Sequence, residues 1–298
     1  MYLIFRKSKK YYLYKSTNMK QIYILLITLL MGLSANAKSS GTCGPDLKWH
    51  LTDDGVLTIT GKGEMYDYSY TPWSYDDLTR VIIGNGVTTI GEAAFRYCSH
   101  LTSVTIPNSV TTIGGWAFSG CSSLTSVNIP NSVTTINDDA FSDCSSLTSV
   151  TIPNSVTTIG SEAFSDCTNL QKVNIGNSVK TIGEYAFNNC TSITQISSEA
   201  VVPPTCESGV FTDINKSKCK LIVPKNSLDA YKQAYQWEDF SLIEGSTTGI
   251  TNTVYNKAGL ADVYTIDGTK RLSKASTDEI NALPKGVYIV NGKKIIIK

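Results

Sequence analysis

The stretch Leu101–Ser123, LTSVTIPNSVTTIGGWAFSGCSS, decides the fold because it recurs along the chain with a period of 23 residues. Copies begin at positions 78, 101, 124, 147 and 170, and a weaker copy begins at 193. Three kinds of side chain keep this step: Phe95, Phe118, Phe141, Phe164 and Phe187; Cys98, Cys121, Cys144, Cys167 and Cys190; Ile90, Ile113, Ile136, Ile159 and Ile182. A fixed period of this length indicates a solenoid, in which each unit buries its apolar edge by stacking on its neighbours.

Within one unit, the apolar and β-branched residues at 101–106 predict a short strand. Pro107-Asn108-Ser109 predicts a turn, because proline fixes φ and asparagine tolerates left-handed backbone. Residues 110–113 predict a second short strand, and residues 117–121 predict a helical turn that points Phe118 into the interior. Coils stacked at the strand spacing of about 4.8 Å turn every apolar position into a ladder of identical side chains.

The repeat pattern LxxVxIPxxVxxIGxxAFxxCxx resembles the BspA-like leucine-rich repeats of bacterial surface proteins. Residues 43–95 resemble the amino-terminal cap of that family, and residues 203–243 resemble its closing segment. The resemblance implies a mainly β repeat solenoid of the leucine-rich-repeat type with 23-residue coils over 78–200, between caps at 38–77 and 201–246. Gly176 replaces the turn proline, and the sixth copy is incomplete, so we expect the stack to end just before the second cap.

Residues 1–37 predict an upstream extension followed by a signal peptide. They carry six basic residues and no acidic one, and the apolar run at 22–33 precedes Ala35-Asn36-Ala37, a small-x-small cleavage pattern. Met19 is the better start of such a peptide, which leaves 1–18 as the extension. A run of 12 apolar residues is shorter than the roughly 20 that cross a bilayer. We therefore expect export and cleavage after Ala37, with no stable membrane span; the alternative is an uncleaved anchor helix.

The last 49 residues predict a separate module. Residues 245–249, GSTTG, are typical of a flexible linker. Asp267-Gly268 and Asn291-Gly292 each separate two apolar, alternating segments, which predicts two hairpins and a small antiparallel β tail over 250–298. The ending YTIDGTK…LPKGVYIVNGKKIIIK resembles the carboxy-terminal sorting domains of type IX secretion.

Charge and composition exclude several functions. The whole chain has a net charge of +1, but residues 38–249 hold 12 basic and 21 acidic residues, a net charge of −9. Nucleic-acid binding needs clustered lysine and arginine, so we expect no nucleic-acid partner. The chain has only two histidines, and it lacks the short motifs of nucleotide, zinc and calcium sites. We therefore expect no cofactor.

The cysteine ladder predicts buried thiols that act as small apolar side chains, because stacked thiols form a line and not a tetrahedral metal site. Cys206 and Cys219, 13 positions apart in the closing segment, are the better candidates for a disulfide. In Cys98-Ser99-His100 a thiol stands near a histidine, but Cys98 occupies the buried ladder position. With no third group to orient the histidine, the sequence predicts no catalytic residues and no enzyme.

Two further clusters each leave an alternative open. Asp139 lies over Glu162 and Asp143 over Asp166 in the predicted stack, which makes these four carboxylates a weak candidate Ca²⁺ site or, alternatively, a solvated face. The segment 64–77, EMYDYSYTPWSYDD, offers a candidate glycan-binding surface or, alternatively, large side chains that seal the first coil. The candidate glycan-binding residues are Tyr66, Tyr68, Tyr70, Trp73 and Tyr75.

The outward positions of the first strand form the candidate protein-binding strand face: Thr105, Asn128, Thr151 and Asn174. This face is nearly uncharged and covers about 400 Å², roughly half of what each partner buries in a standard interface. We expect a monomer that binds weakly and acts through many copies on one surface. The export signal, the solenoid and the lack of an assembled catalytic group predict a non-enzymatic, exported or cell-surface binding protein. The family resemblance implies that it acts in adhesion to extracellular host or bacterial surface proteins. The alternative function is a glycan-binding module over Tyr66–Tyr75.

Overall fold

The computed structural model describes residues 37–246 and, in the tail, residues 261–265, 269–276, 279, 280, 283, 286–290 and 293–297. Residues 1–36 of the predicted leader and the two predicted hairpin turns, Asp267-Gly268 and Asn291-Gly292, lie outside the described residues.

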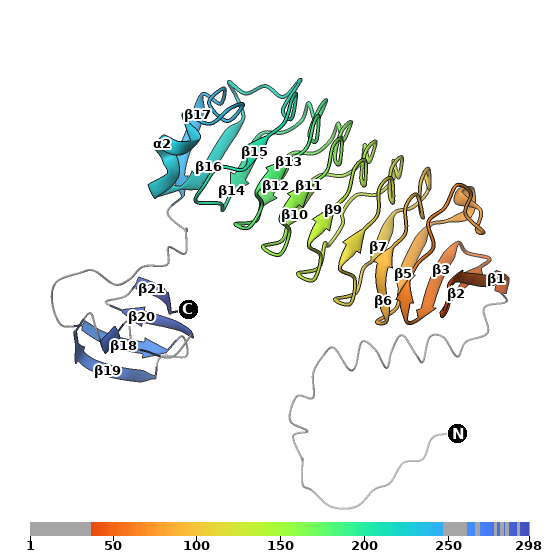
Figure 1. The fold of residues 1–298 in the computed structure, drawn as a ribbon, viewed down its shortest axis with the longest axis horizontal. Helices are drawn as coiled ribbons and strands as arrows, with labels where there is room; N and C mark the ends of the chain where they lie inside the picture. The colour runs from red at the N-terminus through yellow and green to blue at the C-terminus, as the bar shows by residue number, and fades with distance from the viewer. Residues whose placement is uncertain are drawn as a thin grey trace, which may run out of the picture.

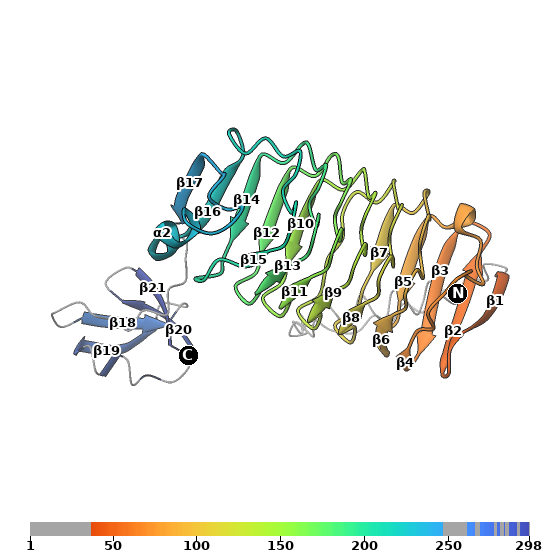
Figure 2. The same ribbon diagram turned by 45° about the horizontal axis from the view of Figure 1, so that its top comes forward.

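The 23-residue units stack into an elongated β-solenoid, whose coils follow one another in sequence order (Figures 1 and 2). We number the coils one to five from positions 78, 101, 124, 147 and 170. Neighbouring coils pair in parallel with a shift of 23 residues, as in Thr151 beside Asn174 and Thr158 beside Thr181. The predicted fold class is confirmed.

Two ladders of parallel strands run along the stack. The first ladder consists of β3 (Val56–Gly61), β5 (Arg80–Ile83) and β7 (Ser103–Thr105), then β10 (Ser149–Ile152), β12 (Lys172–Ile175), β14 (Gln195–Ser198), β16 (Lys220–Pro224) and β17 (Leu242–Ser246). The second ladder consists of β4 (Gly63–Glu64), β6 (Val87–Ile90), β8 (Thr112–Ile113), β9 (Thr135–Ile136), β11 (Thr158–Ile159), β13 (Thr181–Ile182) and β15 (Thr205–Cys206).

The turn between the two ladders is held by its serine. Proline has no N–H to give to a ladder, so each first-ladder strand of coils two and four ends before Pro107 or Pro153. Ser109 then donates its hydroxyl to the Val87 carbonyl of the preceding coil at 2.7 Å, and Ser155 does the same to Val133 at 2.6 Å. Each coil thus satisfies a backbone acceptor of the one before it.

The predicted helical turn at 117–121 is wrong. Trp116 and Gly120 have φ of 52° and 73°, which breaks a helix, and the segment is instead a run of tight turns. Alternate N–H groups of Trp116, Phe118 and Gly120 donate to carbonyls of coil three at 3.0, 2.8 and 2.8 Å. We call residues 114–121 and their equivalents in the other coils the turn edge.

The core is a ladder of aromatic rings, as the repeat predicts. Phe95, Phe118, Phe141, Phe164 and Phe187 are fully buried, with successive ring centroids 5.2 to 5.4 Å apart and planes within 19° of parallel. Trp73 stacks on the first ring at 5.6 Å, and Phe211 follows the last ring at 6.2 Å. One continuous apolar core therefore runs through all five coils and both caps.

The amino-terminal cap is an antiparallel sheet of β1 (Ala37–Gly44), β2 (Leu47–Thr52) and β3, and β3 begins the parallel pairing with β5. A 3₁₀ turn (Tyr75–Asp77) leads into coil one.

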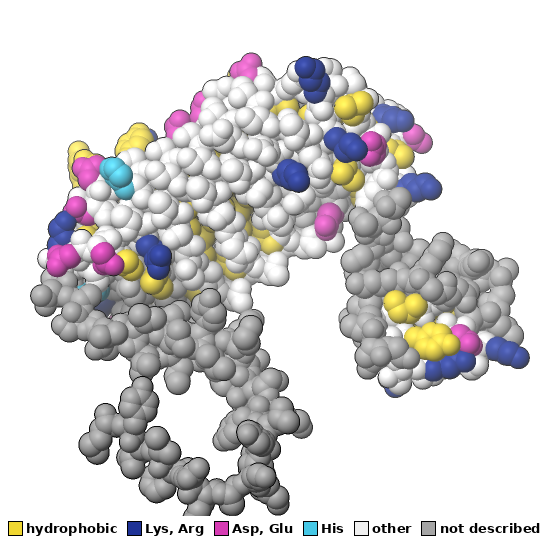
Figure 3. Space-filling model, turned by 180° about the vertical axis from the view of Figure 1, so that it is seen from behind, with side chains coloured by type: hydrophobic (Ala, Val, Ile, Leu, Met, Phe, Trp, Pro, Cys, Tyr) yellow, Lys and Arg dark blue, Asp and Glu magenta, His cyan; other side chains and the backbone are white. Residues whose placement is uncertain are grey.

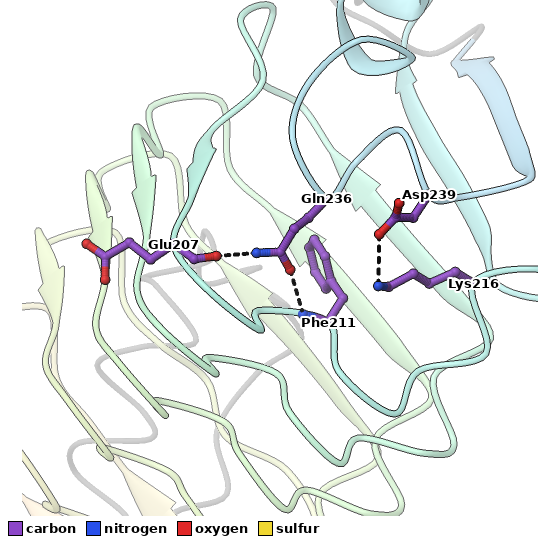
Figure 4. Close-up of polar contacts among 5 residues, drawn as sticks. All are labelled: Glu207, Phe211, Lys216, Gln236 and Asp239. Carbon is purple, nitrogen blue, oxygen red and sulfur yellow. Dashed lines mark hydrogen bonds and ion pairs between the residues drawn. The ribbon is translucent and has the colours of Figure 1, made fainter.

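The carboxy-terminal cap folds a 3₁₀ turn (Lys225–Ser227) and the short helix α2 (Leu228–Tyr231) over the last coil. Gln236 links the cap to that coil: its amide accepts from the Phe211 N–H and donates to the Glu207 carbonyl (Figure 4). Lys216 and Asp239 form an ion pair of 3.1 Å beside it.

The stack continues beyond the boundary that we expected near residue 200. Phe211 extends the ring ladder, and β16 and β17 extend the first ladder. Gly245 and Ser246, predicted to begin a flexible linker, belong to β17 and pair with Val223 and Pro224. The carboxy-terminal cap thus continues the solenoid.

The tail forms the predicted small antiparallel β module. Its sheet has the order β19 (Lys270–Ala275), β18 (Ala261–Thr265), β20 (Gly286–Val290) and β21 (Lys293–Ile297). A small core of its own holds it together: Val263, Ala275, Ile280, Tyr288 and Val290.

Candidate functional site

The four residues of the predicted strand face, Thr105, Asn128, Thr151 and Asn174, are all exposed. Thr151 and Asn174 lie side by side on β10 and β12, and the Asn174 amide donates to the Thr151 hydroxyl at 3.3 Å. Thr105 lies on β7, in the other sheet of the first ladder.

The first ladder is interrupted at coil three, where Asn128 lies. Its strands form two separate sheets, one ending at β7 and one beginning at β10 (Figure 1). Within residues 37–246, the N–H and C=O groups of Ser126–Ile129 make no ladder hydrogen bond, whereas the second ladder runs on through β8, β9 and β11. Coil three therefore presents peptide groups that the other coils use internally.

A hollow of about 320 Å³ lies at this interruption. Six polar and four apolar residues line it, and none is charged: Asn108, Ser126, Asn128, Asn131, Ser149 and Thr151, with Val127, Ile129, Pro130 and Pro153. Amide and hydroxyl side chains both donate and accept hydrogen bonds. The hollow thus suits a neutral, hydrogen-bonding ligand group.

The surroundings of the stack's middle coils are poor in positive charge. Arg96 is the only basic residue between Arg80 and Lys172. Figure 3 shows one face on which the middle of the stack is largely free of charged side chains. This face offers hydrogen-bonding groups and shape, and few charges that could steer a partner.

The five candidate glycan-binding aromatics do not form one surface. Trp73 is 3% exposed, stacks on Phe95 and donates its indole N–H to the Ala94 carbonyl at 3.1 Å. Tyr68 packs its ring against the Trp73 ring, while Tyr70 is 94% exposed. Tyr66 and Tyr75 are about half-exposed. The prediction of a flat aromatic platform is therefore wrong, because two of its rings seal the end of the core.

The four candidate metal ligands form two pairs on the turn edge. Burial raises the pKa of Asp139, and the negative charge of the neighbouring Glu162 raises it further. Burial and the negative charge of Asp166 raise the pKa of Asp143 in the same way. Asp166 accepts hydrogen bonds from Asn189 at 2.6 Å and from Ser165 at 3.0 Å. In the described part of the chain, no three His, Cys, Asp or Glu side chains gather as metal ligands would.

The cysteine ladder is buried, and its thiols bond to the backbone. Cys144 donates to the Phe118 carbonyl of the preceding coil at 3.3 Å, and Cys121, Cys167 and Cys190 each make the same contact with the phenylalanine carbonyl of the coil before them. Burial raises the pKa of Cys98 and of Cys144 to about 12. His100 is exposed, whereas Cys98 is 1% exposed, so the two do not form a nucleophile with its base.

Cys206 and Cys219 are free thiols, contrary to the predicted disulfide. Cys206 lies on β15 in the second ladder, and Cys219 directly precedes β16 in the first ladder. Each is buried, with a raised pKa of about 12 and about 11, respectively. The two cysteines are near in sequence, but the coil carries them to different sheets.

A cluster that was not predicted from the sequence lies on the turn edge of coils one and two and consists of Arg96, Tyr97 and Trp116. The Arg96 guanidinium lies over both rings, 4.7 Å from the Tyr97 centroid and 5.6 Å from that of Trp116. The signal was a departure from the repeat: the position of Arg96 is serine in coils two to four, and that of Tyr97 is glycine or aspartate.

Comparison with known proteins agrees with the repeat. A family model described as "BspA type Leucine rich repeat region", with six copies, matches residues 68–194 and 177–276. No curated protein matches the chain. Among the described residues, no helix has the length and apolar character needed to cross a membrane.

Solved structures of leucine-rich repeat proteins are similar to this chain. One from T. pallidum is 30% identical over 58% of this chain and 89% of its own, with a TM-score of 0.45. One from Bacteroides ovatus is 24% identical over 61% of this chain and 59% of its own, with a TM-score of 0.44. A leucine rich cell surface protein from Faecalibacterium prausnitzii is 23% identical over 65% of this chain and 73% of its own, with a TM-score of 0.38.

Proposed function

The chain belongs to the BspA-type leucine-rich repeat family, and from that premise we propose that it is a non-enzymatic, protein-binding protein of the cell surface that acts in adhesion. The observation that carries the proposal is the uncharged hollow at coil three, where unpaired peptide groups and neutral polar side chains meet on a rigid stack.

The binding site is the strand face, centred on Asn128 and Thr151, which both line the hollow. A partner segment gains hydrogen bonds from these side chains and from the peptide groups of Ser126–Ile129. The continuous ring ladder beneath holds the face rigid, so little conformational entropy is lost on binding.

The size of the face sets the strength of binding. A strand face of about 400 Å² is smaller than the roughly 800 Å² that each partner buries in a stable complex. The protein therefore binds weakly as a monomer and strongly when many copies share one surface.

The proposal includes export and sorting. Residues 1–37 direct secretion, and the β tail at 250–298 acts as a sorting signal for the cell surface. The partners are extracellular proteins of a host or of other bacteria. The chemistry is binding alone, with no cofactor.

The experiment is an unbiased pull-down of surface and matrix proteins with residues 38–246, repeated with two variants. Asn128→Ala with Thr151→Ala removes two hydrogen-bonding groups from the hollow, and we expect capture of the partner to fall about tenfold. The matched control, Thr134→Ala with Thr181→Ala, changes exposed positions on the side of the second ladder and should capture as the wild type does. Equal capture by both variants would contradict the strand-face assignment.

A further inference from the structure

A second surface, on the turn edge of coils one and two, holds an arginine in a fixed position. The Arg96 guanidinium lies 4.7 Å from the Tyr97 ring centroid and 5.6 Å from that of Trp116, and its Nη2 donates to the Tyr97 hydroxyl at 3.0 Å. Stacking on two rings and one hydrogen bond together restrict a side chain that is otherwise among the most flexible.

The Tyr97 ring is itself held in place by the next coil. A Cβ at Gly120 would lie 2.6 Å from Tyr97 Cδ1, so the ring packs directly over a glycine that has φ of +73°. Tyr97 and Trp116 have φ of 60° and 52°, a backbone conformation that bulky side chains rarely adopt. The equivalent positions of the other coils share this backbone, so it belongs to the turn edge of every coil.

The cluster is open to solvent. Arg96 is exposed and Tyr97 is 56% exposed, while Trp116 is half-buried. Among the described residues, no carboxylate oxygen lies within ion-pair distance of Arg96. Its charge does act on Asp139 of coil three, where it opposes the rise in the pKa of that carboxyl. An exposed guanidinium with a fixed orientation thus keeps N–H donors available for a ligand.

The geometry selects a carboxylate in preference to a neutral sugar. A sugar would need an open ring face, but the Arg96 guanidinium lies over the Tyr97 ring and Gly120 packs against the same ring. Arg96 is exposed, and a planar guanidinium matches a carboxylate with two parallel hydrogen bonds. Arginine, tyrosine and tryptophan are also the residues that dominate binding energy at protein interfaces.

We propose that Arg96, Tyr97 and Trp116 form a second recognition site, which binds a carboxylate side chain in an acidic segment of a partner protein. The carboxylates of coils three and four, Asp139, Asp143, Glu162 and Asp166, continue the same turn edge. They repel further acidic residues, so the acidic part of the segment is short and is followed by neutral or basic residues.

The tryptophans provide a selective readout in the full chain. Trp49, Trp73 and Trp237 are at most 5% exposed, so Trp116 is the indole that a dissolved quencher reaches. The probes are three synthetic peptides of equal length with glutamate, lysine or only neutral residues, and free N-acetylneuraminic acid as an acidic sugar. The measurement is protection of Trp116 from acrylamide quenching as each probe is added.

We expect protection by the glutamate peptide alone, weaker at high salt. Arg96→Ser restores the residue of coils two to four and should weaken the effect at least about tenfold. Arg96→Lys keeps the positive charge without the planar guanidinium and should weaken the protection by the glutamate peptide several-fold. The Asn128→Ala, Thr151→Ala variant should respond as the wild type does, which separates this site from the strand face.

Three results would overturn the proposal. They are no protection by the glutamate peptide, equal protection in wild type and Arg96→Ser proteins that unfold at the same temperature, and protection by the acidic sugar without protection by the peptide.

Discussion

Phe141 lies in the middle of the ring ladder, 5.3 Å from Phe118 on one side and 5.3 Å from Phe164 on the other. Replacing a fully buried phenylalanine by alanine removes its apolar contacts and leaves a cavity that a stack on both sides prevents from closing. We predict that Phe141→Ala lowers the free energy of unfolding by about 3–5 kcal/mol, measured by denaturant titration.

Phe95 provides a comparison at the end of the stack. A loosely packed cap would make Phe95→Ala the milder change, but Trp73 covers the Phe95 ring at 5.6 Å and both are buried. We therefore predict a loss of similar size, about 3–5 kcal/mol. Losses below about 1 kcal/mol at both Phe95 and Phe141 would show that the rings are not the core.

Asp139 links stability to pH. Burial and the nearby Glu162 raise its pKa in the folded state, so the native protein favours the protonated carboxyl. The free energy of unfolding therefore falls as pH rises from the ordinary value of 3.8 through the raised one. We predict that Asp139→Asn raises the melting temperature at about pH 7 and changes it little at about pH 3. The same shift at both pH values would contradict this origin.

The eight cysteines should all be reduced and unreactive in the folded protein, since each is buried and free. Burial that raises the pKa of Cys144 to about 12 leaves almost no thiolate at neutral pH. We predict slow reaction of the native protein with a thiol reagent and eight reactive thiols after unfolding without reductant. A count of six reactive thiols would instead indicate a disulfide between Cys206 and Cys219.

At the level of strands and turns, the sequence predicts the features that all copies of the repeat share. Both ladders and the inward phenylalanines follow from residues that recur every 23 positions. The turn edge was mistaken for a helical turn, because left-handed backbone at Trp116 or Tyr97 cannot be read from residues that ordinarily avoid it. The site features, namely the interruption near Asn128 and the Arg96 cluster, arise where one coil differs from its neighbours.

The interruption at coil three makes a prediction about hydrogen exchange. The amides of Val127 and Ile129 make no ladder hydrogen bond, whereas Val150 and Ile152 lie at the same repeat positions within β10. Amides without a hydrogen bond exchange readily, so those of Val127 and Ile129 should exchange much faster in the native protein. Equal protection at the two pairs would mean that the first ladder is continuous in solution and that the hollow has no free peptide groups.

At the scale of the whole molecule, the tail and the solenoid each have a core of their own. A protein truncated after Ser246 retains every strand of the solenoid, so it should keep the solenoid's thermal transition. If residues 250–298 act as the sorting signal, the same truncation should abolish display at the cell surface. Full surface display of the truncated protein would reject the sorting role.

Weak and uncharged binding by the strand face is tested by a biosensor titration of monomeric residues 38–246 against the captured partner at about 50 and about 500 mM salt. Arg96→Ser in this protein removes the contribution of the turn edge. We predict a micromolar Kd that changes less than about threefold with salt and rises about tenfold in Asn128→Ala, Thr151→Ala. A nanomolar Kd, a steep salt dependence or an unchanged affinity of that variant would contradict the account.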